Sequence, residues 1–276
     1  METSSFKDYL KNSYPSPKSR ASSAYLKSIE IIDDIFRKND VFDLNNTSIA
    51  KIKNPVLIAR IIEFIEEEEE KFRLGVKSIF DLGKPTQTSY PKGRFCTAAV
   101  HKLGEFVNEN CHKDLSGVMK NFTKGKKLAT ALSEKYDINE KGTEKEVRAK
   151  RRVGQDIFRN ILLEIYDNKC CLSGLDIPQV LRASHIIPWS ESAPNRLNPE
   201  NGLCLSATYD AAFDRHLITF DEDYRLVLSP ILKELYTSKA FKTHFLDFEG
   251  RAIQVPSLYK PSQIFLEKHR EKLLVS

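Results

Sequence analysis

The stretch Arg182–His216, which reads RASHIIPWSESAPNRLNPENGLCLSATYDAAFDRH, decides the fold expected for the second half of the chain. A short apolar run that contains His185 stops at a proline, which is typical of a β-strand. The Asn201–Gly202 pair predicts a tight turn before a second strand. Asp210 and Asp214 then stand four residues apart, so a helix would present both carboxylates on one face. The expected order is strand, turn, strand, helix.

These residues have both a chemical and an ordinary structural interpretation. Histidine is the side chain best suited to accept a proton from water near neutral pH, and hard divalent cations prefer oxygen ligands such as paired carboxylates. Taken alone, however, His185 could be a core residue, and an Asn-Gly pair is usually only a turn. The two aspartates could equally be neutralised by Arg182, Arg196 and Arg215 instead of by a cation. Trp189 and the Cys170–Cys171 pair are expected to be packing residues.

The first 115 residues have the apolar periodicity of helices. Apolar residues recur at helical spacing in the segments 23–38, 54–72 and 94–111. This pattern predicts a helical domain over residues 1–115, with a role in recognising a target or a partner. The run Glu66–Glu70 is expected to be the solvated end of the second helix and not a metal site.

Residues 116–152 have a different composition, which predicts a basic linker or an extended helix between two domains. Lys120–Arg152 contains eleven Lys and Arg against five Asp and Glu, an excess larger than the net charge of +5 of the whole chain. Lys150, Arg151 and Arg152 are candidate phosphate contacts, because neutralising phosphates releases counterions and favours binding. A solvated linker explains the same composition equally well.

The overall composition excludes several classes of protein. Of the 276 residues, 41% are hydrophobic and 29% are charged, as in a folded globular protein. The first residues lack the apolar region of a signal peptide, and no apolar run is long enough to span a membrane, so we expect a cytoplasmic protein. The five cysteines include no CxxC pair, which argues against a disulfide scaffold and against a four-cysteine zinc site.

Four segments, taken in order, resemble the ββα-metal site of HNH endonucleases, in particular a subgroup found in bacterial restriction-type proteins. They are CCLSG (170–174), SHIIPW (184–189), NRLNPENGLCL (195–205) and AAFDRHLITFD (211–221). The similarity extends from about residue 152 to residue 223. It implies an α+β protein, with a mainly helical N-terminal domain and a C-terminal ββα-metal nuclease domain over residues 153–276.

The resemblance also implies roles for individual residues. His185 would be the general base that activates water, and Asn201 would either ligate a cation or hold the hairpin so that His185 points correctly. Asp210 and Asp214 would bind a divalent cation, Mg²⁺ or Mn²⁺. The implied substrate is double-stranded DNA, and the site contacts to it are assigned to Arg182, Arg196 and Arg215. Cutting both strands with one site per chain would favour a homodimer.

The sequence departs from the family pattern at three positions. Ser184 stands where many HNH sites have a metal-binding aspartate or histidine, and Asp210 replaces the last family histidine. His216 falls where relatives often have glycine. These departures favour an oxygen-ligated Mg²⁺ or Mn²⁺ site over zinc, and the missing CxxC pairs remove the structural zinc of many HNH proteins. A catalytically weak HNH fold that binds DNA, or a subunit of a larger defence complex, is the alternative.

Overall fold

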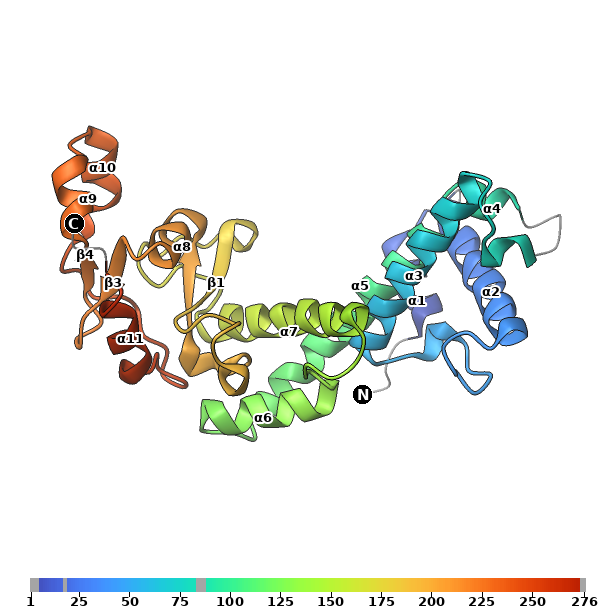
Figure 1. Cartoon of the computed structure of the whole chain (residues 1–276), viewed down its shortest axis with the longest axis horizontal. Helices are drawn as coiled ribbons and strands as arrows, with labels where there is room; N and C mark the ends of the chain where they lie inside the picture. Colours follow the sequence, from blue (N-terminus) through green and yellow to red (C-terminus); the bar gives the residue numbers. More distant parts are fainter. Residues whose placement is uncertain (1–4, 17–18, 83–87, 274–276) are drawn as a thin grey trace. The chain divides into compact units, whose positions relative to one another are not determined.

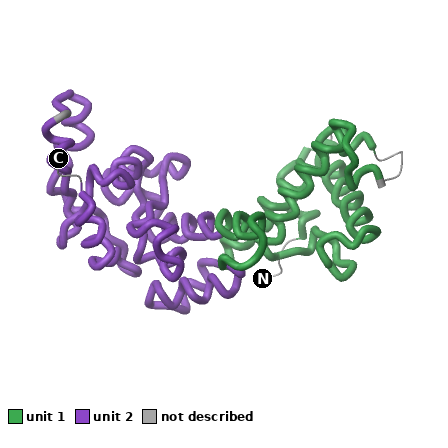
Figure 2. The backbone as a smooth tube through the Cα atoms, in the orientation of Figure 1, with its two compact units in different colours: residues 1–114, 139–153 green, residues 115–138, 154–276 purple. Residues whose placement is uncertain are grey.

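The computed structural model describes residues 5–16, 19–82 and 88–273, which form two compact units (Figure 2). The first unit comprises residues 1–114 and 139–153, and the second comprises residues 115–138 and 154–276. Helices α5 (Phe95–Met119) and α7 (Glu144–Ile165) each contribute residues to both units. The segment that we predicted to be a basic linker or an extended helix is mostly helical: it supplies α6 (Gly125–Tyr136) to the second unit and the start of α7 to the first.

The first unit is helical, as the apolar periodicity predicts (Figure 1). Besides α5 and the start of α7, it contains α1 (Phe6–Ser13), α2 (Ala21–Asn39), α3 (Pro55–Arg73) and α4 (Ser89–Lys92), with 3-10 turns at Ile49–Lys51 and Ile79–Leu82. Helix α3 begins at a proline, and the side chain of Asn54 accepts hydrogen bonds from the backbone N–H groups of the first turn. The buried faces of α1, α2, α3 and α5 contribute isoleucine, leucine or phenylalanine to one core.

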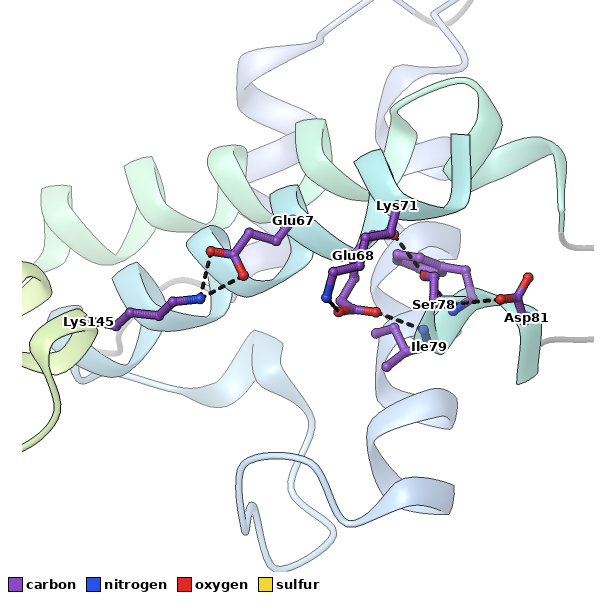
Figure 3. A network of polar contacts seen from close by, with 8 residues as sticks. Glu67, Glu68, Lys71, Ser78, Ile79, Asp81 and Lys145 are labelled. Carbon is purple, nitrogen blue, oxygen red and sulfur yellow. Dashed lines mark hydrogen bonds and ion pairs between the residues drawn. The ribbon is translucent and has the colours of Figure 1, made fainter. Parts of the chain in front are cut away.

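The middle of the acidic run at the end of α3 is structural, so the expectation that the run is solvated is wrong for Glu68 and Glu69, whereas Glu66 and Glu70 are exposed. Glu68 is buried and accepts hydrogen bonds from Lys71 Nζ at 2.6 Å and from the backbone N–H of Ile79 at 2.9 Å (Figure 3). Glu67 accepts both of its hydrogen bonds from Lys145 Nζ, at 2.7 Å. Glu69 is 1% exposed and accepts the backbone N–H groups at the start of α5. The run therefore joins α3 to α7, to the 3-10 turn at 79–82 and to α5.

Replacing Glu69 by alanine is expected to destabilise the first unit by about 1–3 kcal/mol, because two buried N–H groups lose their acceptor. The backbone N–H groups of Cys96 and Thr97 each lie 3.1 Å from a Glu69 carboxylate oxygen. Glu67→Ala is the matched control, since it removes an exposed ion pair that is worth about 0–1 kcal/mol. Urea unfolding followed by circular dichroism measures both, and equal destabilisation by the two changes would contradict the assignment.

The second unit is built on two small antiparallel sheets and confirms the predicted α+β class. Strand β1 (Leu181–His185) pairs with β2 (Gly202–Ser206), with His185 opposite Gly202. Strand β3 (Ile218–Phe220) pairs with β4 (Leu226–Leu228). Helix α8 (Ala207–Asp214) follows β2 directly and packs on both β1 and β2. The strand, turn, strand, helix order predicted from the sequence is thus observed.

Shorter elements complete the second unit. They are helices α9 (Pro230–Leu235), α10 (Lys239–His244) and α11 (Gln263–Arg270), and 3-10 turns at Pro178–Val180, Ala193–Asn195 (η5), Pro199–Asn201 (η6) and Leu246–Phe248. The segment CCLSGL (170–175) forms a turn, with Gly174 at φ +75°. Cys170 is buried there, and its sulfur accepts the backbone N–H of Ser206 at 3.2 Å. None of the helices in the described ranges combines the length and the apolar character that crossing a membrane requires.

Helix α7 packs closely behind the hairpin of β1 and β2. Gly202 makes this approach possible, because a Cβ atom at that position would lie 2.6 Å from Phe158 and from Leu162. Phe158 and Leu162 are both fully buried. The opposite residue of the hairpin, His185, consequently lies against α7, and this contact determines the environment of its imidazole.

Candidate active site

The imidazole of His185 is fixed on three sides. Its ring stacks on Phe158 of α7, with ring centroids 3.8 Å apart and planes inclined by 14°. The Trp189 ring meets it edge-on at 5.7 Å, and Nε2 lies 2.9 Å from the carbonyl oxygen of Arg196. A carbonyl oxygen can only accept a hydrogen bond, so Nε2 must carry the proton and Nδ1 is left with a lone pair. This tautomer is the one that a general base at Nδ1 requires.

Burial holds this imidazole in its neutral form. It lowers the pKa of His185 from its ordinary value of 6.5 to about 4, and the hydrogen bond to the Arg196 carbonyl offsets only part of that effect. At neutral pH the ring is therefore unprotonated and able to accept a proton. The same burial makes His185 a weak base, because a catalytic base is most effective when its pKa lies near the working pH.

Trp189 is a packing residue in this arrangement. The Arg196 guanidinium lies 5.3 Å from the centre of its ring, and Arg196 Nε donates to the Trp189 carbonyl oxygen at 2.9 Å. On the other side, a Cβ atom at Gly154 would lie 2.6 Å from the indole. The contacts between Trp189 and Arg196 join the two ends of the segment 189–196, and both residues contact the His185 ring.

Asn201 ties the same loop together and is almost completely buried. Its amide oxygen accepts the backbone N–H of Ile187 at 2.8 Å, and its amide nitrogen donates to the carbonyl oxygens of Ile187 at 3.0 Å and Asn195 at 3.2 Å. The whole amide is thus engaged by backbone groups. Of the two roles implied by the resemblance, this geometry corresponds to holding the hairpin and not to ligating a cation.

The second cluster lies where β1 meets α8. The hydroxyl of Ser184, a buried residue, donates a short hydrogen bond to Oδ1 of Asp210. Asp214 lies one turn further along α8, where partial burial and the charge of Asp210 raise its pKa. Two carboxylates are therefore held close enough to repel one another. His185 directly follows Ser184 and is the last residue of β1. Within the described residues, however, no hydrogen bond joins the Ser184–Asp210 pair to His185.

The donor set suits Mg²⁺ or Mn²⁺ better than zinc. Across the described part of the chain, no group of three or more His, Cys, Asp and Glu side chains is arranged to hold a metal. Mg²⁺ keeps several water ligands and is commonly bound by one or two carboxylates together with substrate phosphates. Asp210 and Asp214 supply that number of carboxylates, and a bound cation would relieve the repulsion that raises the pKa of Asp214.

His216 belongs to a third cluster, on α11 and β3. It has φ +54°, a left-handed conformation that glycine adopts more readily than other residues. Its Nδ1 lies 3.2 Å from Nε2 of His269, a buried residue of α11. His269 also contacts the Phe213 carbonyl oxygen at 3.1 Å and the Thr219 hydroxyl at 3.0 Å. Sequence reasoning missed His269, although its spacing of three residues from buried Leu266 would have indicated the inner face of the last helix.

Low pH is expected to destabilise the second unit through two histidines. Burial lowers the pKa of both His185 and His269 from 6.5 to about 4. Between these pH values the unfolded chain binds protons that the folded chain does not, so the free energy of unfolding falls as the pH is lowered. Each histidine contributes up to about 1.4 kcal/mol per pH unit.

Urea unfolding between pH 7 and 5, followed by the fluorescence of the single tryptophan, Trp189, reports on this unit. His269→Gln should reduce the pH slope by about one proton, whereas His244→Gln, at an exposed position, should leave it unchanged. An unchanged slope in His269→Gln would show that His269 is not held neutral.

The six basic candidates have different environments. Arg182 and Arg215 are exposed: Arg182 donates to the carbonyl oxygens of Gln179 and Leu181, and Arg215 donates to that of Ala211. Arg151 and Arg152 are also exposed on α7. Lys150 is buried instead, and its Nζ donates to Asn139 Oδ1 at 2.8 Å and to the Lys141 carbonyl oxygen at 2.9 Å. Its ammonium therefore stabilises the turn before α7 and is not displayed to a ligand.

The hairpin and α8 lie in a segment that is similar to a known protein family. Residues 170–221 match the family model described as HNH endonuclease. The matched segment runs from the Cys170 turn to the end of β3 and includes His185, Asn201, Asp210 and Asp214. No curated protein matches the chain.

Proposed function

The chain carries a domain of the HNH endonuclease family, and we propose that it is a metal-dependent DNA endonuclease that hydrolyses phosphodiester bonds. The observation that carries this proposal is the state of His185. Its ring is clamped, its Nε2 is bonded to a carbonyl oxygen, and its low pKa leaves Nδ1 unprotonated at neutral pH. A free lone pair on Nδ1 at neutral pH is what a general base requires, and His185 lies inside the segment that matches the HNH family model.

His185 acts as the general base in the proposed reaction. Nδ1 accepts a proton from a water molecule as the water oxygen attacks phosphorus. The imidazolium that forms is stabilised by its Nε2–H bond to the Arg196 carbonyl oxygen, 2.9 Å away. The bond from phosphorus to the 3′ oxygen breaks, and that oxygen takes a proton from solvent. The products are a 3′ hydroxyl and a 5′ phosphate.

Asp210 and Asp214 hold the divalent cation in this proposal, and Ser184 orients Asp210 through its hydrogen bond. When bound, the cation supplies Lewis-acid stabilisation of the charge that develops on the phosphate and the leaving oxygen. Asn201 is a positioning residue, because its three backbone hydrogen bonds hold the loop that carries the Arg196 carbonyl.

The proposed substrate is duplex DNA, bound near the site by Arg182, Arg196 and Arg215. Phosphate contacts of this kind carry no sequence information, so we assign target or partner recognition to the helical first unit. A cytoplasmic restriction or other anti-phage role fits this division of labour and rests on family analogy. Arg151 and Arg152 remain candidate phosphate contacts on α7.

Incubation of supercoiled plasmid with the purified chain tests the proposal. With Mg²⁺ or Mn²⁺ we expect nicked circles, and with EDTA none. Because the predicted ends are 3′ hydroxyl and 5′ phosphate, DNA ligase should reseal the nicks. Nicks that ligase cannot close would contradict the proposed chemistry.

A DNA-binding protein with a weakened HNH site is the second candidate. Two observations favour it: Ser184 occupies a common ligand position, and the pKa of His185, about 4, is far below the optimum for a base at neutral pH. Plasmid that stays intact in Mg²⁺ and Mn²⁺ but is bound with a steep salt dependence would select this function.

A further inference from the structure

Exposed lysines gather at the start of α6, outside the segment that matches the HNH family. Lys124, Lys126 and Lys127, here called the α6 lysine patch, are all exposed in the second unit. They line a surface hollow in which Glu134 is the single acidic residue. Within the described residues, no ion pair or side-chain hydrogen bond engages their ammonium groups.

Several other lysines of the chain are neutralised by neighbouring glutamates. Lys71 and Lys145 in the first unit and Lys233 and Lys272 in the second all form ion pairs with glutamates. The α6 lysine patch is therefore a local excess of positive charge that the fold itself does not use for stability. Lys120, which directly follows α5 and lies four residues before Lys124 in the sequence, is also exposed.

Helix α6 is anchored to the loop that forms the candidate active site. The backbone N–H of Gly125 donates to Glu200 Oε1 at 3.1 Å. A Cβ atom at Gly125 would lie 2.2 Å from Asn198 Oδ1, so only glycine allows this approach. Helix α6 also packs against η5 and η6, the two turns on either side of Arg196, and η6 ends at Asn201. Because Glu200 already occupies the first N–H of the helix, the attraction for anions comes from the lysine side chains.

We infer that the α6 lysine patch binds the backbone phosphates of the duplex DNA that enters the site, which extends the DNA-binding surface beyond the HNH segment. This inference rests on the proposed function. The patch offers three ammonium groups against one carboxylate, on an element packed against the loop that holds His185. Polyanionic DNA is the complementary partner, and the contact is independent of base sequence.

A charge-matched pair of variants tests the inference in the full chain. The patch variant carries Lys124→Gln, Lys126→Gln and Lys127→Gln. The control carries Lys239→Gln, Lys242→Gln and Lys268→Gln, which removes the same charge from exposed positions of the same unit. The dissociation constant for a fluorescent DNA duplex is measured by anisotropy in EDTA, at several salt concentrations, with a single strand of the same sequence as a second probe.

The patch variant should bind the duplex at least about tenfold more weakly at 0.1 M salt, and its slope of log K against log salt should be shallower by about 2–3, since each phosphate contact contributes about 0.9. The control should keep most of the wild-type slope. Equal slopes in the two variants, or no change in either, would overturn the inference, as would a loss confined to the single strand. Plasmid nicking by the wild type separates this result from the proposed function. If the wild type cuts but the patch variant keeps the wild-type salt slope, only the inference about the patch is wrong. If the patch variant has a shallower salt slope but the wild type does not cut, only the proposed nuclease activity is wrong.

Discussion

Replacing His185 by alanine is expected to lower the rate of plasmid nicking by about 10²–10⁴-fold, the usual contribution of a positioned general base. The expectation follows from the tautomer, since Nε2 is committed to the Arg196 carbonyl oxygen and Nδ1 carries the free lone pair. It also follows from burial, which keeps the ring neutral at the pH of the assay. Single-turnover nicking in Mg²⁺ measures the effect.

Loss of the ring also removes its contacts with Phe158 and Trp189, so folding has to be checked separately. The fluorescence of Trp189 reports directly on this region. His244→Ala is the matched control, because His244 is an exposed histidine of the same unit, on α10. A folded His185→Ala protein that nicks within a few-fold of wild type would show that another group activates the water.

Replacing Asp210 by asparagine is expected to lower the nicking rate by about 10²–10³-fold, because the lost Lewis-acid stabilisation is worth several kcal/mol. Asparagine has almost the same shape, and its oxygen can still accept the hydrogen bond from Ser184. The change therefore removes the charge of Asp210 and largely preserves the packing. It should also raise the Mg²⁺ concentration needed for half-maximal rate. Asp214→Asn should act in the same direction with a smaller effect, because the side chain of Asp214 is more exposed than that of Asp210.

Measuring the nicking rate at increasing Mg²⁺ concentrations distinguishes a loss of cation binding from a loss of activity through misfolding. Asp223→Asn is the control, since it removes a carboxylate from an exposed turn between β3 and β4. If Asp210→Asn kept the wild-type rate and the wild-type Mg²⁺ dependence, the cation would have to bind elsewhere.

Local sequence signals predicted the framework of the site. The apolar run before Pro188, the Asn201–Gly202 turn and the spacing of Asp210 and Asp214 depend on neighbouring residues, and β1, β2 and α8 form where these signals stand. The resemblance to the family, and not a local signal, singled out His216, whose φ of +54° lies in a region that favours glycine.

Features that depend on distant residues could not be predicted. The neutral state of His185 requires Phe158, which is 27 positions earlier in the chain and stacks on it at 3.8 Å. Glu69 looked solvated because it lies in a charged run, yet it caps α5 at Cys96 and Thr97. The electrostatic environment of a side chain is set by tertiary neighbours, and a charged residue gives no local sign of which neighbours it will have.

The basic segment shows the same limit. Its composition predicted exposed positive charge, and the exposed residues Arg151 and Arg152 agree with that pattern. Lys150, next to them, is instead buried and bonded to Asn139 and Lys141. One turn of a helix exposes some of its residues and buries others, and a run of like residues does not reveal which face will be covered.

The most direct test of the account compares wild type and His185→Ala on one preparation of supercoiled plasmid, with Mg²⁺ and with EDTA. The account predicts nicked circles from the wild type in Mg²⁺, none in EDTA, and a rate lower by about 10²–10⁴-fold in the variant. Equal cutting by both proteins would contradict it, because the cleavage would then not depend on the clamped imidazole at the end of β1.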